Sequence, residues 1–168
     1  MRNTMPAGYI SGIKLKSVKK CFLFFLILGA TGAKAQSIRN NEIQISPITF
    51  TGNTAKLSTA ADSGLAQLQR YLTAKSYISL MRIEGHVAAG GNAQALSEQR
   101  AMAVCQWLIS HGVECSRLIA VGFGNTKPAS ADASQNTRIV ASNAALRGHP
   151  IGGMPAEGGG RNAGALCR

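Results

Sequence analysis

The stretch EGHVAAGGNAQALSEQRAMAVCQWLISHGV, residues 84–113, decides the fold because it connects the end of a strand to a long helix. Asn92 is a suitable N-cap for this helix, and Gly112 is a suitable C-terminal stop. Between them, four residues at four-residue spacing share one helix face: Leu96, Arg100, Val104 and Leu108. Arg100 therefore interrupts an otherwise apolar stripe.

Two interpretations of Arg100 remain open on spacing alone. In the first, its stem lies on apolar surface while its guanidinium reaches water or pairs with an acid such as Glu84. In the second, the planar fork of the guanidinium faces the loop after the preceding strand and binds a carboxylate through two hydrogen bonds. Periodicity by itself favours the first interpretation.

Strand patterns and helix patterns alternate along the rest of the chain. Residues 42–50 alternate isoleucine with polar residues and predict an extended entry segment. Ser58 is the predicted N-cap of a helix that runs through Lys75, with leucines at helical spacing. This βαβαββ order predicts a two-layer α+β domain with two main helices on one face of a mixed β-sheet. The remaining predicted elements are strands at 76–85, 117–124 and 137–142 and a loop at 125–135.

The first 35 residues predict a cleavable secretory signal. The basic segment KLKSVKK precedes the apolar run CFLFFLILGATG, and small residues end at Ala35, where a signal peptidase would cut. A membrane anchor is the alternative, but the run is shorter than the roughly 20 apolar residues that span a bilayer. Cys21 precedes the run, so it is not placed to carry a lipid. The predicted parts are a signal at 1–35, an N-terminal extension at 36–44, a domain at 45–146 and a glycine-rich flexible tail at 147–168.

The charge balance changes when the predicted signal is set aside. The whole chain has a formal net charge of +11, and residues 1–35 hold six Lys or Arg and no acid. The remainder therefore has 12 basic and 7 acidic residues, or +5. No basic run with interleaved aromatic residues remains, so nucleic-acid binding is not expected. A mildly basic surface is compatible with an anionic polymer such as the cell wall.

Three cysteines follow the predicted signal, in a compartment that we expect to be oxidising. Cys105 lies in the predicted long helix, and Cys115 follows three residues after Gly112. The chain reversal between them predicts a Cys105–Cys115 disulfide, with a buried free thiol at Cys105 as the alternative. Cys167 in the tail would then be unpaired.

Patterns for catalysis or metal binding are weak. His86, His111 and His149 are scattered, and no pair has ligand spacing on one helix. The segment GFGNTK, residues 122–127, lacks the third glycine of a dinucleotide-binding loop and predicts a turn. We expect neither an enzyme nor a cofactor or metal site.

Residues 83–128 resemble the periplasmic domain of the outer membrane protein A family. The family pattern is G-H-T-D, a short loop, N-x-x-L-S-x-x-R-A-x-x-V, Gly-Val, G-x-G and Pro. The segments ITFTGNTAKL and NTRIV resemble the opening and closing strands of that domain, so the resemblance runs from about Ile45 to Ser142. The matching residues are Gly85, His86, Leu96, Ser97, Arg100, Ala101, Val104, Gly112, Val113, Gly122, Gly124, Pro128, Asn136 and Arg138.

The resemblance implies non-covalent binding of peptidoglycan. In that family the helix arginine, here Arg100, pairs with a carboxylate of diaminopimelate in the stem peptide, and the aspartate of T-D binds its ammonium. The aspartate position is Ala88 in this chain, the loop that follows is shorter, and the asparagine of the pattern falls on Ala93, beside Asn92. The resulting candidate ligand-binding positions are Arg100, Asn92, His86 and Ala88, where the family aspartate is missing.

Two functional hypotheses follow from the resemblance. The first is a periplasmic protein of a Gram-negative, outer-membrane-associated envelope that binds the peptidoglycan stem peptide and anchors an envelope protein or complex. The second is a structural component of a secretion, conjugation or motor-type envelope assembly that has lost peptidoglycan binding. The departures from the pattern concentrate at ligand positions, so the site either binds a differently charged ligand or no longer binds. No transmembrane segment is expected in the mature chain, which should start near Gln36.

Overall fold

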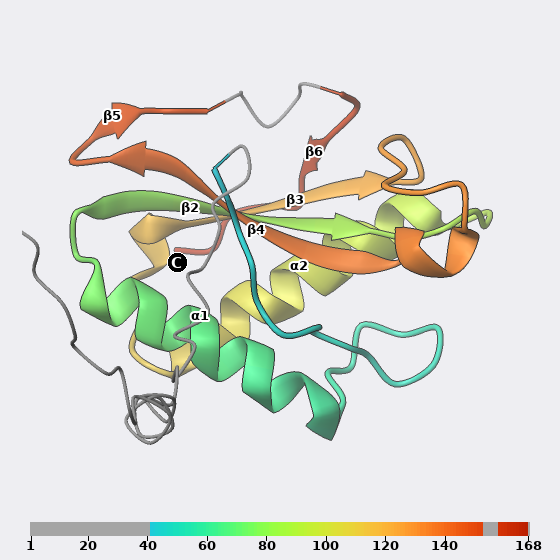
Figure 1. The fold of residues 1–168 in the computed structure, drawn as a ribbon, viewed down its shortest axis with the longest axis horizontal. Coiled ribbons are helices and arrows are strands. Elements are labelled where there is room, and N and C mark those ends of the chain that lie inside the picture. The colour runs from blue at the N-terminus through green and yellow to red at the C-terminus, as the bar shows by residue number, and fades with distance from the viewer. Residues whose placement is uncertain (1–40, 153–157, 168) are drawn as a thin grey trace, which may run out of the picture. The chain divides into compact units, whose positions relative to one another are not determined.

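The computed structural model describes residues 41–152 and 158–167 (Figure 1). The predicted signal at 1–35 and most of the predicted extension at 36–44 lie outside the described residues. A mixed sheet forms one layer of the fold, and two helices form the other. The two-layer α+β fold predicted from the sequence is confirmed.

The sheet is built around β2 (Ile78–His86), which lies between a parallel and an antiparallel neighbour. The parallel neighbour is β3 (Leu118–Gly124), and the antiparallel one is β4 (Arg138–Leu146). A parallel pair needs a crossover between its strands, and the long helix of the quoted stretch provides it. Three short strands complete the sheet: β1 (Glu42–Ile43) and β5 (His149–Pro150) on β4, and β6 (Arg161–Asn162) on β3.

The predicted entry strand at 42–50 is much shorter in the structure. Residues 44–49 belong to no strand, and Phe50 makes a single bridge with Leu57. Pro47 has no backbone N–H to donate, which disfavours continuation of a ladder. The segment is held against the first helix instead, because Gln67 accepts a hydrogen bond from the backbone N–H of Ser46 at 2.8 Å and donates to its hydroxyl at 2.9 Å.

Two helices, α1 (Asp62–Ala74) and α2 (Ala93–Ser110), pack on the same face of the sheet (Figure 1). Their apolar residues recur at helical spacing and are buried in one core with the strands. Each leucine buried in this way stabilises the fold by roughly 1.5–3 kcal/mol. The leucines and valine of the helices in this core are Leu65, Leu68, Leu72, Val104 and Leu108, while Leu96 packs with Val87 and Ala93 in a second, smaller cluster.

The helix starts differ from the predicted caps. A 3₁₀ turn, η1 (Thr59–Ala61), precedes α1, and Ser58 makes no capping hydrogen bond. The hydroxyl of Ser58 is used elsewhere, in a 2.6 Å hydrogen bond with the hydroxyl of Thr49. Asn92 does occupy the N-cap position of α2, but its side chain makes no capping hydrogen bond either. At the other end, Gly112 has a φ of 89° and follows the helix as predicted.

Small residues let α2 lie directly on the sheet. A Cβ atom at Gly85 of β2 would collide with the carbonyl oxygen of Ser97, and one at Gly122 of β3 would collide with Glu98 and Ser97. The hydroxyl of Ser97 accepts a hydrogen bond from the backbone N–H of Gly124 at 2.8 Å and donates one to the carbonyl of Gln94 at 2.7 Å. Gly85, Gly122 and Ser97, which all belong to the sequence pattern, therefore allow α2 to pack closely on the sheet.

The predicted Cys105–Cys115 disulfide is wrong. Cys115 is joined to Cys167, 52 residues later in the sequence, and Cys105 is a free, fully buried thiol. Cys105 is on the face of α2 that packs into the core, whereas Cys115 begins the short 3₁₀ helix η2 (Cys115–Arg117) with its side chain partly exposed. The alternative prediction of a buried free thiol at Cys105 is the one that the structure supports.

The predicted flexible tail at 147–168 is also wrong for its described part. The backbone N–H of Ala163 donates to the carbonyl of Ala120 at 2.9 Å, and β6 continues this pairing along β3. Leu166 packs on the core, and the adjacent Cys167 carries the disulfide. Glycine content predicted mobility, but pairing with a sheet edge and a covalent link hold the segment in place.

Within the described ranges, no helix combines the length and the apolar composition that crossing a bilayer requires.

Candidate ligand-binding site

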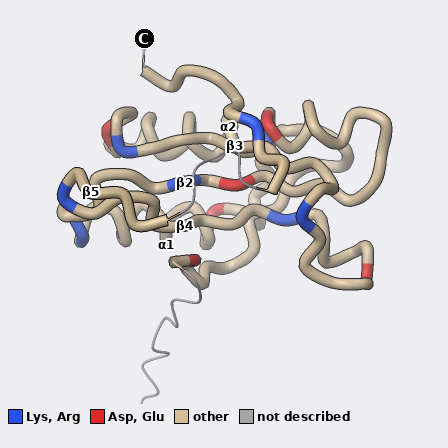
Figure 2. The backbone as a smooth tube through the Cα atoms, turned by 90° about the horizontal axis from the view of Figure 1, so that it is seen from above, with Lys and Arg blue, Asp and Glu red and all other residues tan. Residues whose placement is uncertain are grey.

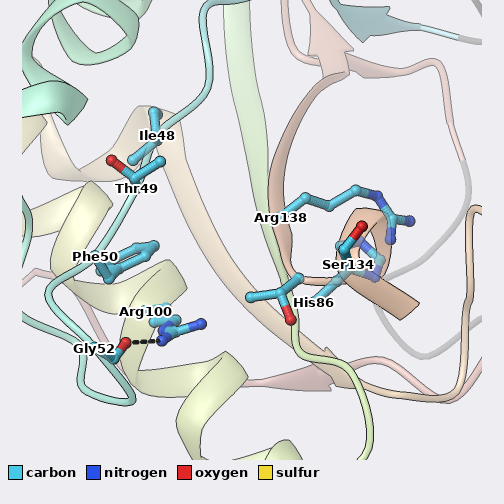
Figure 3. Close-up of a pocket in the computed structure, with 9 residues that line it drawn as sticks. Ile48, Thr49, Phe50, Gly52, His86, Arg100, Ser134 and Arg138 are labelled. Atoms are coloured by element: carbon cyan, nitrogen blue, oxygen red, sulfur yellow. Dashed lines mark hydrogen bonds between the residues drawn. The ribbon is translucent and has the colours of Figure 1, made fainter. Parts of the chain in front are cut away.

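A pocket of about 270 Å³ lies at the end of β2, between the segment that precedes α1 and the start of β4. Figure 3 shows Arg100 with Phe50 and Gly52 on one side of it, and His86, Ser134 and Arg138 on the other. The complete lining is Ile48, Thr49, Phe50, Gly52, His86, Arg100, Ser134, Thr137 and Arg138.

Arg100 forms one wall of the pocket and is only 5% exposed. Its Nε donates to the carbonyl oxygen of Thr54 at 2.9 Å, and its Nη2 donates to that of Gly52 at 3.0 Å. The guanidinium carbon lies 4.8 Å from the ring centre of Phe50, a favourable cation–π distance. Burial lowers the pKa of Arg100, but an arginine stays protonated in proteins. Arg100 therefore brings a fixed positive charge to the pocket.

The loop that Arg100 holds has hydrogen bonds of its own. The backbone N–H of Thr51 donates to the carbonyl of Lys56 at 2.8 Å, and the hydroxyl of Thr54 donates to the carbonyl of Thr51 at 2.7 Å. Gly52 has a φ of 56°, in the left-handed region that glycine adopts without strain. The loop thus presents two carbonyl oxygens to the guanidinium in a defined geometry.

Glu84 does not pair with Arg100, contrary to the first interpretation of that arginine. Side chains alternate along β2, so Glu84 points to the sheet face opposite Gly85 and α2. It is 1% exposed, and one carboxylate oxygen accepts a hydrogen bond from Arg82 Nε at 2.7 Å. Its other oxygen lies 3.2 Å from His86 Nε2 and 3.4 Å from Lys127 Nζ.

The charge of Glu84 is retained in this buried position. Burial alone would raise the pKa of its carboxyl group, but the hydrogen bond with His86 and the charges of Arg82 and Lys127 lower it to about 2. An ionised carboxylate only accepts hydrogen bonds, so Nε2 of His86 must be the donor. The negative charge of Glu84 is therefore compensated by its neighbours, and the carboxylate does not itself line the pocket, although its partner His86 does.

His86 is a buried, neutral wall of the pocket. Its ring stacks on Phe123 with centroids 5.1 Å apart, and the side chain is 1% exposed. Burial lowers the pKa of His86, and the hydrogen bond with Glu84 opposes that shift only in part. Among the described residues, Nδ1 has no hydrogen-bond partner. His86 thus adds an uncharged surface to the site.

Arg138 is a second cation of the site, at the start of β4. Its Nη2 donates to the carbonyl of Lys127 at 3.2 Å, and burial lowers the pKa of Arg138 without neutralising it. Next to it, the hydroxyl of Thr137 accepts a hydrogen bond from the backbone N–H of Ala88 at 3.0 Å. The amide oxygen of Asn136 accepts from the backbone N–H of Ala129 at 2.8 Å, which shapes the loop beside the pocket.

The structure brings together some of the predicted site residues. Arg100 and His86 both line the pocket, whereas Ala88 does not line it but donates its backbone N–H to the lining residue Thr137. Asn92 is exposed and does not line it. The prediction missed the segment 48–52 and the side of the pocket formed by the 3₁₀ helix η3 (Ala133–Asn136) and the start of β4, although the sequence pattern had matched Asn136 and Arg138. The missed lining residues are Ile48, Thr49, Phe50, Gly52, Ser134, Thr137 and Arg138.

Comparison with known proteins agrees with this arrangement. The fold defines a class of small α+β domains in which two helices cover one face of a mixed sheet. The sequence model of the OmpA family matches residues 49–141, which is more than half of the chain, so the chain belongs to the OmpA family.

Solved structures with a similar fold include periplasmic domains of MotB. The periplasmic domain of Helicobacter pylori MotB is 16% identical with a TM-score of 0.53, and the match covers 64% of this chain and 86% of that one. The C-terminal domain of the same protein is 19% identical with a TM-score of 0.53, over 58% of this chain and 83% of that one. At these identities the likeness concerns the fold.

Proposed function

We propose that this protein is a periplasmic, non-catalytic module that binds peptidoglycan and anchors an envelope protein or complex to it. Membership of the OmpA family and the likeness to periplasmic domains support the envelope location. The observation that carries the proposal is the guanidinium of Arg100, clamped by two backbone carbonyls at the wall of a pocket.

A clamped guanidinium suits a carboxylate of the peptidoglycan stem peptide. Arg100 donates its Nε hydrogen to the carbonyl of Thr54 and one Nη2 hydrogen to the carbonyl of Gly52. No described residue accepts a hydrogen bond from its Nη1. A guanidinium has five N–H donors in a fixed plane, so donors remain for a ligand oxygen. Because the side chain is already immobilised, little rotamer entropy is lost when a ligand binds.

Sedimentation with purified sacculi tests this proposal. The wild-type protein should pellet with sacculi, and Arg100→Ala should reduce the bound fraction at least about tenfold, as expected when a charge-assisted hydrogen bond is lost. Arg70→Ala is the matched control, because Arg70 is exposed on α1 and does not line the pocket. Failure of the wild type to pellet, or equal pelleting of all three proteins, would overturn the proposal.

The export step is proposed on the sequence alone. The basic and apolar segments that end at Ala35 support removal of residues 1–35. Intact-mass measurement of the exported protein should give a chain that begins near Gln36. A mass that includes the apolar run would contradict export by a cleaved signal.

A further inference from the structure

The charged side chains that line the pocket are of one sign. Arg100 and Arg138 line it from opposite sides, and its lining contains no acidic side chain (Figure 3). Its other polar groups are uncharged, namely the hydroxyls of Thr137 and Ser134 and the neutral ring of His86. In the described part of the chain, ten Lys and Arg stand against six Asp and Glu, and both kinds are spread over several elements (Figure 2).

The acids on the surrounding elements do not supply a free negative charge. Glu84 is buried and already paired with Arg82, His86 and Lys127. Asp132 is occupied by the loop, since one of its oxygens accepts hydrogen bonds from the backbone N–H and the hydroxyl of Ser134 at 2.9 and 2.8 Å. Glu42 and Glu84 both act on Arg138 through space, but neither side chain lines the pocket.

We propose that the pocket selects a carboxylate whose neighbouring amine is acylated, in preference to a zwitterion with a free ammonium. This inference rests on the proposed function, because it names the charge class of the peptidoglycan group that Arg100 binds. An ammonium in the pocket would meet two guanidinium groups and no carboxylate. Even with the screening of water, repulsion from one such charge at about 4 Å weakens binding about fivefold.

Acylation removes the repulsion and leaves groups that the pocket can accommodate. The amide that replaces the ammonium is uncharged. Its oxygen can accept a hydrogen bond from the hydroxyl of Thr137, and its N–H can donate to the hydroxyl oxygen of Ser134, whose own hydrogen is used by Asp132. The carboxylate stays available to Arg100. In a stem peptide, an acylated amine is the state of an amine that has been used to form a peptide cross-link.

Chemical acetylation of sacculi provides the test. Purified sacculi are divided, and one half is treated with acetic anhydride so that its free amines become uncharged amides. The wild-type protein should bind the acetylated half at least about fivefold more tightly than the untreated half. Equal binding, or a preference for untreated sacculi, would overturn the inference while leaving the proposed function intact. Absence of binding to either half would overturn the proposed function itself.

A pair of variants separates the pocket from general electrostatics, because acetylation also makes the wall more anionic. Ala88→Asp adds a carboxylate beside Thr137 of the lining and should abolish or reverse the preference for acetylated sacculi. Arg70→Gln lowers the net charge by the same amount on exposed α1 and should retain the preference. If both variants lose it equally, the preference comes from net charge and the inference is wrong.

An NMR titration with small molecules tests the same inference without the polymer. Diaminopimelate and its N,N′-diacetyl derivative are titrated into the isotope-labelled protein, and the side-chain N–H signals of Arg100 and Arg138 are followed by NMR. The diacetyl compound should shift both signals at lower concentration than the zwitterion. The opposite order would overturn the inference.

Discussion

Arg100 on α2 donates its Nε hydrogen to the carbonyl oxygen of Thr54, which lies 46 residues earlier in the chain, at 2.9 Å. Together with the second hydrogen bond, to the carbonyl of Gly52, this contact holds the loop before α1 against α2. The arginine that interrupts an apolar stripe therefore has two roles. It fixes the loop by donating to two of its backbone carbonyls, and it holds a positive charge in a fixed orientation at the pocket wall.

Arg100→Lys should separate the charge of this residue from its geometry. Lysine keeps the charge but lacks the planar fork, so at least one loop carbonyl loses its donor. We expect the free energy of unfolding to fall by about 1–3 kcal/mol in urea titrations, together with weaker pelleting on sacculi. Arg70→Lys, on the exposed side of α1, should change neither quantity. Unchanged stability and binding in Arg100→Lys would show that the fork is dispensable.

Ala88→Asp should strengthen binding to untreated sacculi. The backbone N–H of Ala88 is bonded to Thr137, a residue of the pocket lining, so we expect a carboxylate at position 88 to come close enough to pair with a free ligand ammonium. A new charge-assisted hydrogen bond should raise the affinity roughly tenfold to a hundredfold. Ala89→Asp adds the same charge one residue further along, at an exposed position. An equal gain in that control would attribute the effect to charge in general.

Reduction of the Cys115–Cys167 disulfide should destabilise the protein. Opening a loop of 52 residues restores conformational entropy to the unfolded chain, and the chain-entropy model gives about 4 kcal/mol. Cys167→Ser should lower the melting temperature to that of the reduced wild type, with no further effect of reductant. Burial raises the pKa of the Cys105 thiol to about 12, so Cys105 should resist alkylation until the chain unfolds. Peptide mapping that links Cys105 to either partner would contradict the pairing.

Acidification should unfold the protein through two buried groups. The pKa of Glu84 is lowered to about 2, so its contribution is complete above about pH 5 and is lost as the pH falls towards 2, in total about 3 kcal/mol. The pKa of His86 is lowered as well, so below its ordinary value of 6.5 the unfolded chain takes up a proton that the folded chain does not. Stability should therefore fall from neutral pH downwards.

Urea unfolding at a series of pH values measures this dependence. Glu84→Gln should flatten the decline between about pH 5 and pH 2, because the residue no longer titrates. Glu114→Gln changes an exposed acid and should leave the curve of the wild type unaltered. A Glu84→Gln curve parallel to that of the wild type would show that other groups cause the acid sensitivity.

Gly85→Ala should destabilise the contact between helix and sheet. The added Cβ would collide with the carbonyl oxygen of Ser97 on α2, and overpacking of this kind costs about 1–3 kcal/mol. Gly90→Ala is the matched control, because a Cβ there meets nothing within 4 Å. Equal stability of the two variants, measured by thermal melting, would argue against the close approach of α2 to β2.

The sequence by itself determined the class of the fold. Helical spacing of apolar residues marked both helices, and strand patterns located β2, β3 and the start of β4 within a few residues. These features are local, because burial of one face imposes a period that can be counted along the chain. The same periodicity identified Arg100 as unusual, and the sequence pattern placed it with His86 in one candidate site.

Only the tertiary structure decided which distant groups meet. The partner of Cys115 lies 52 residues away and that of Arg100 lies 46 residues away, so no local spacing encodes either contact. The same holds for Arg138, which reaches the pocket because β4 pairs antiparallel with β2 and sets Arg138 opposite His86. Chain reversal near Gly112 suggested a short disulfide, but the orientation of Cys105 towards the core ruled it out. Side-chain direction depends on how elements pack, and packing is settled by the whole set of long-range contacts together.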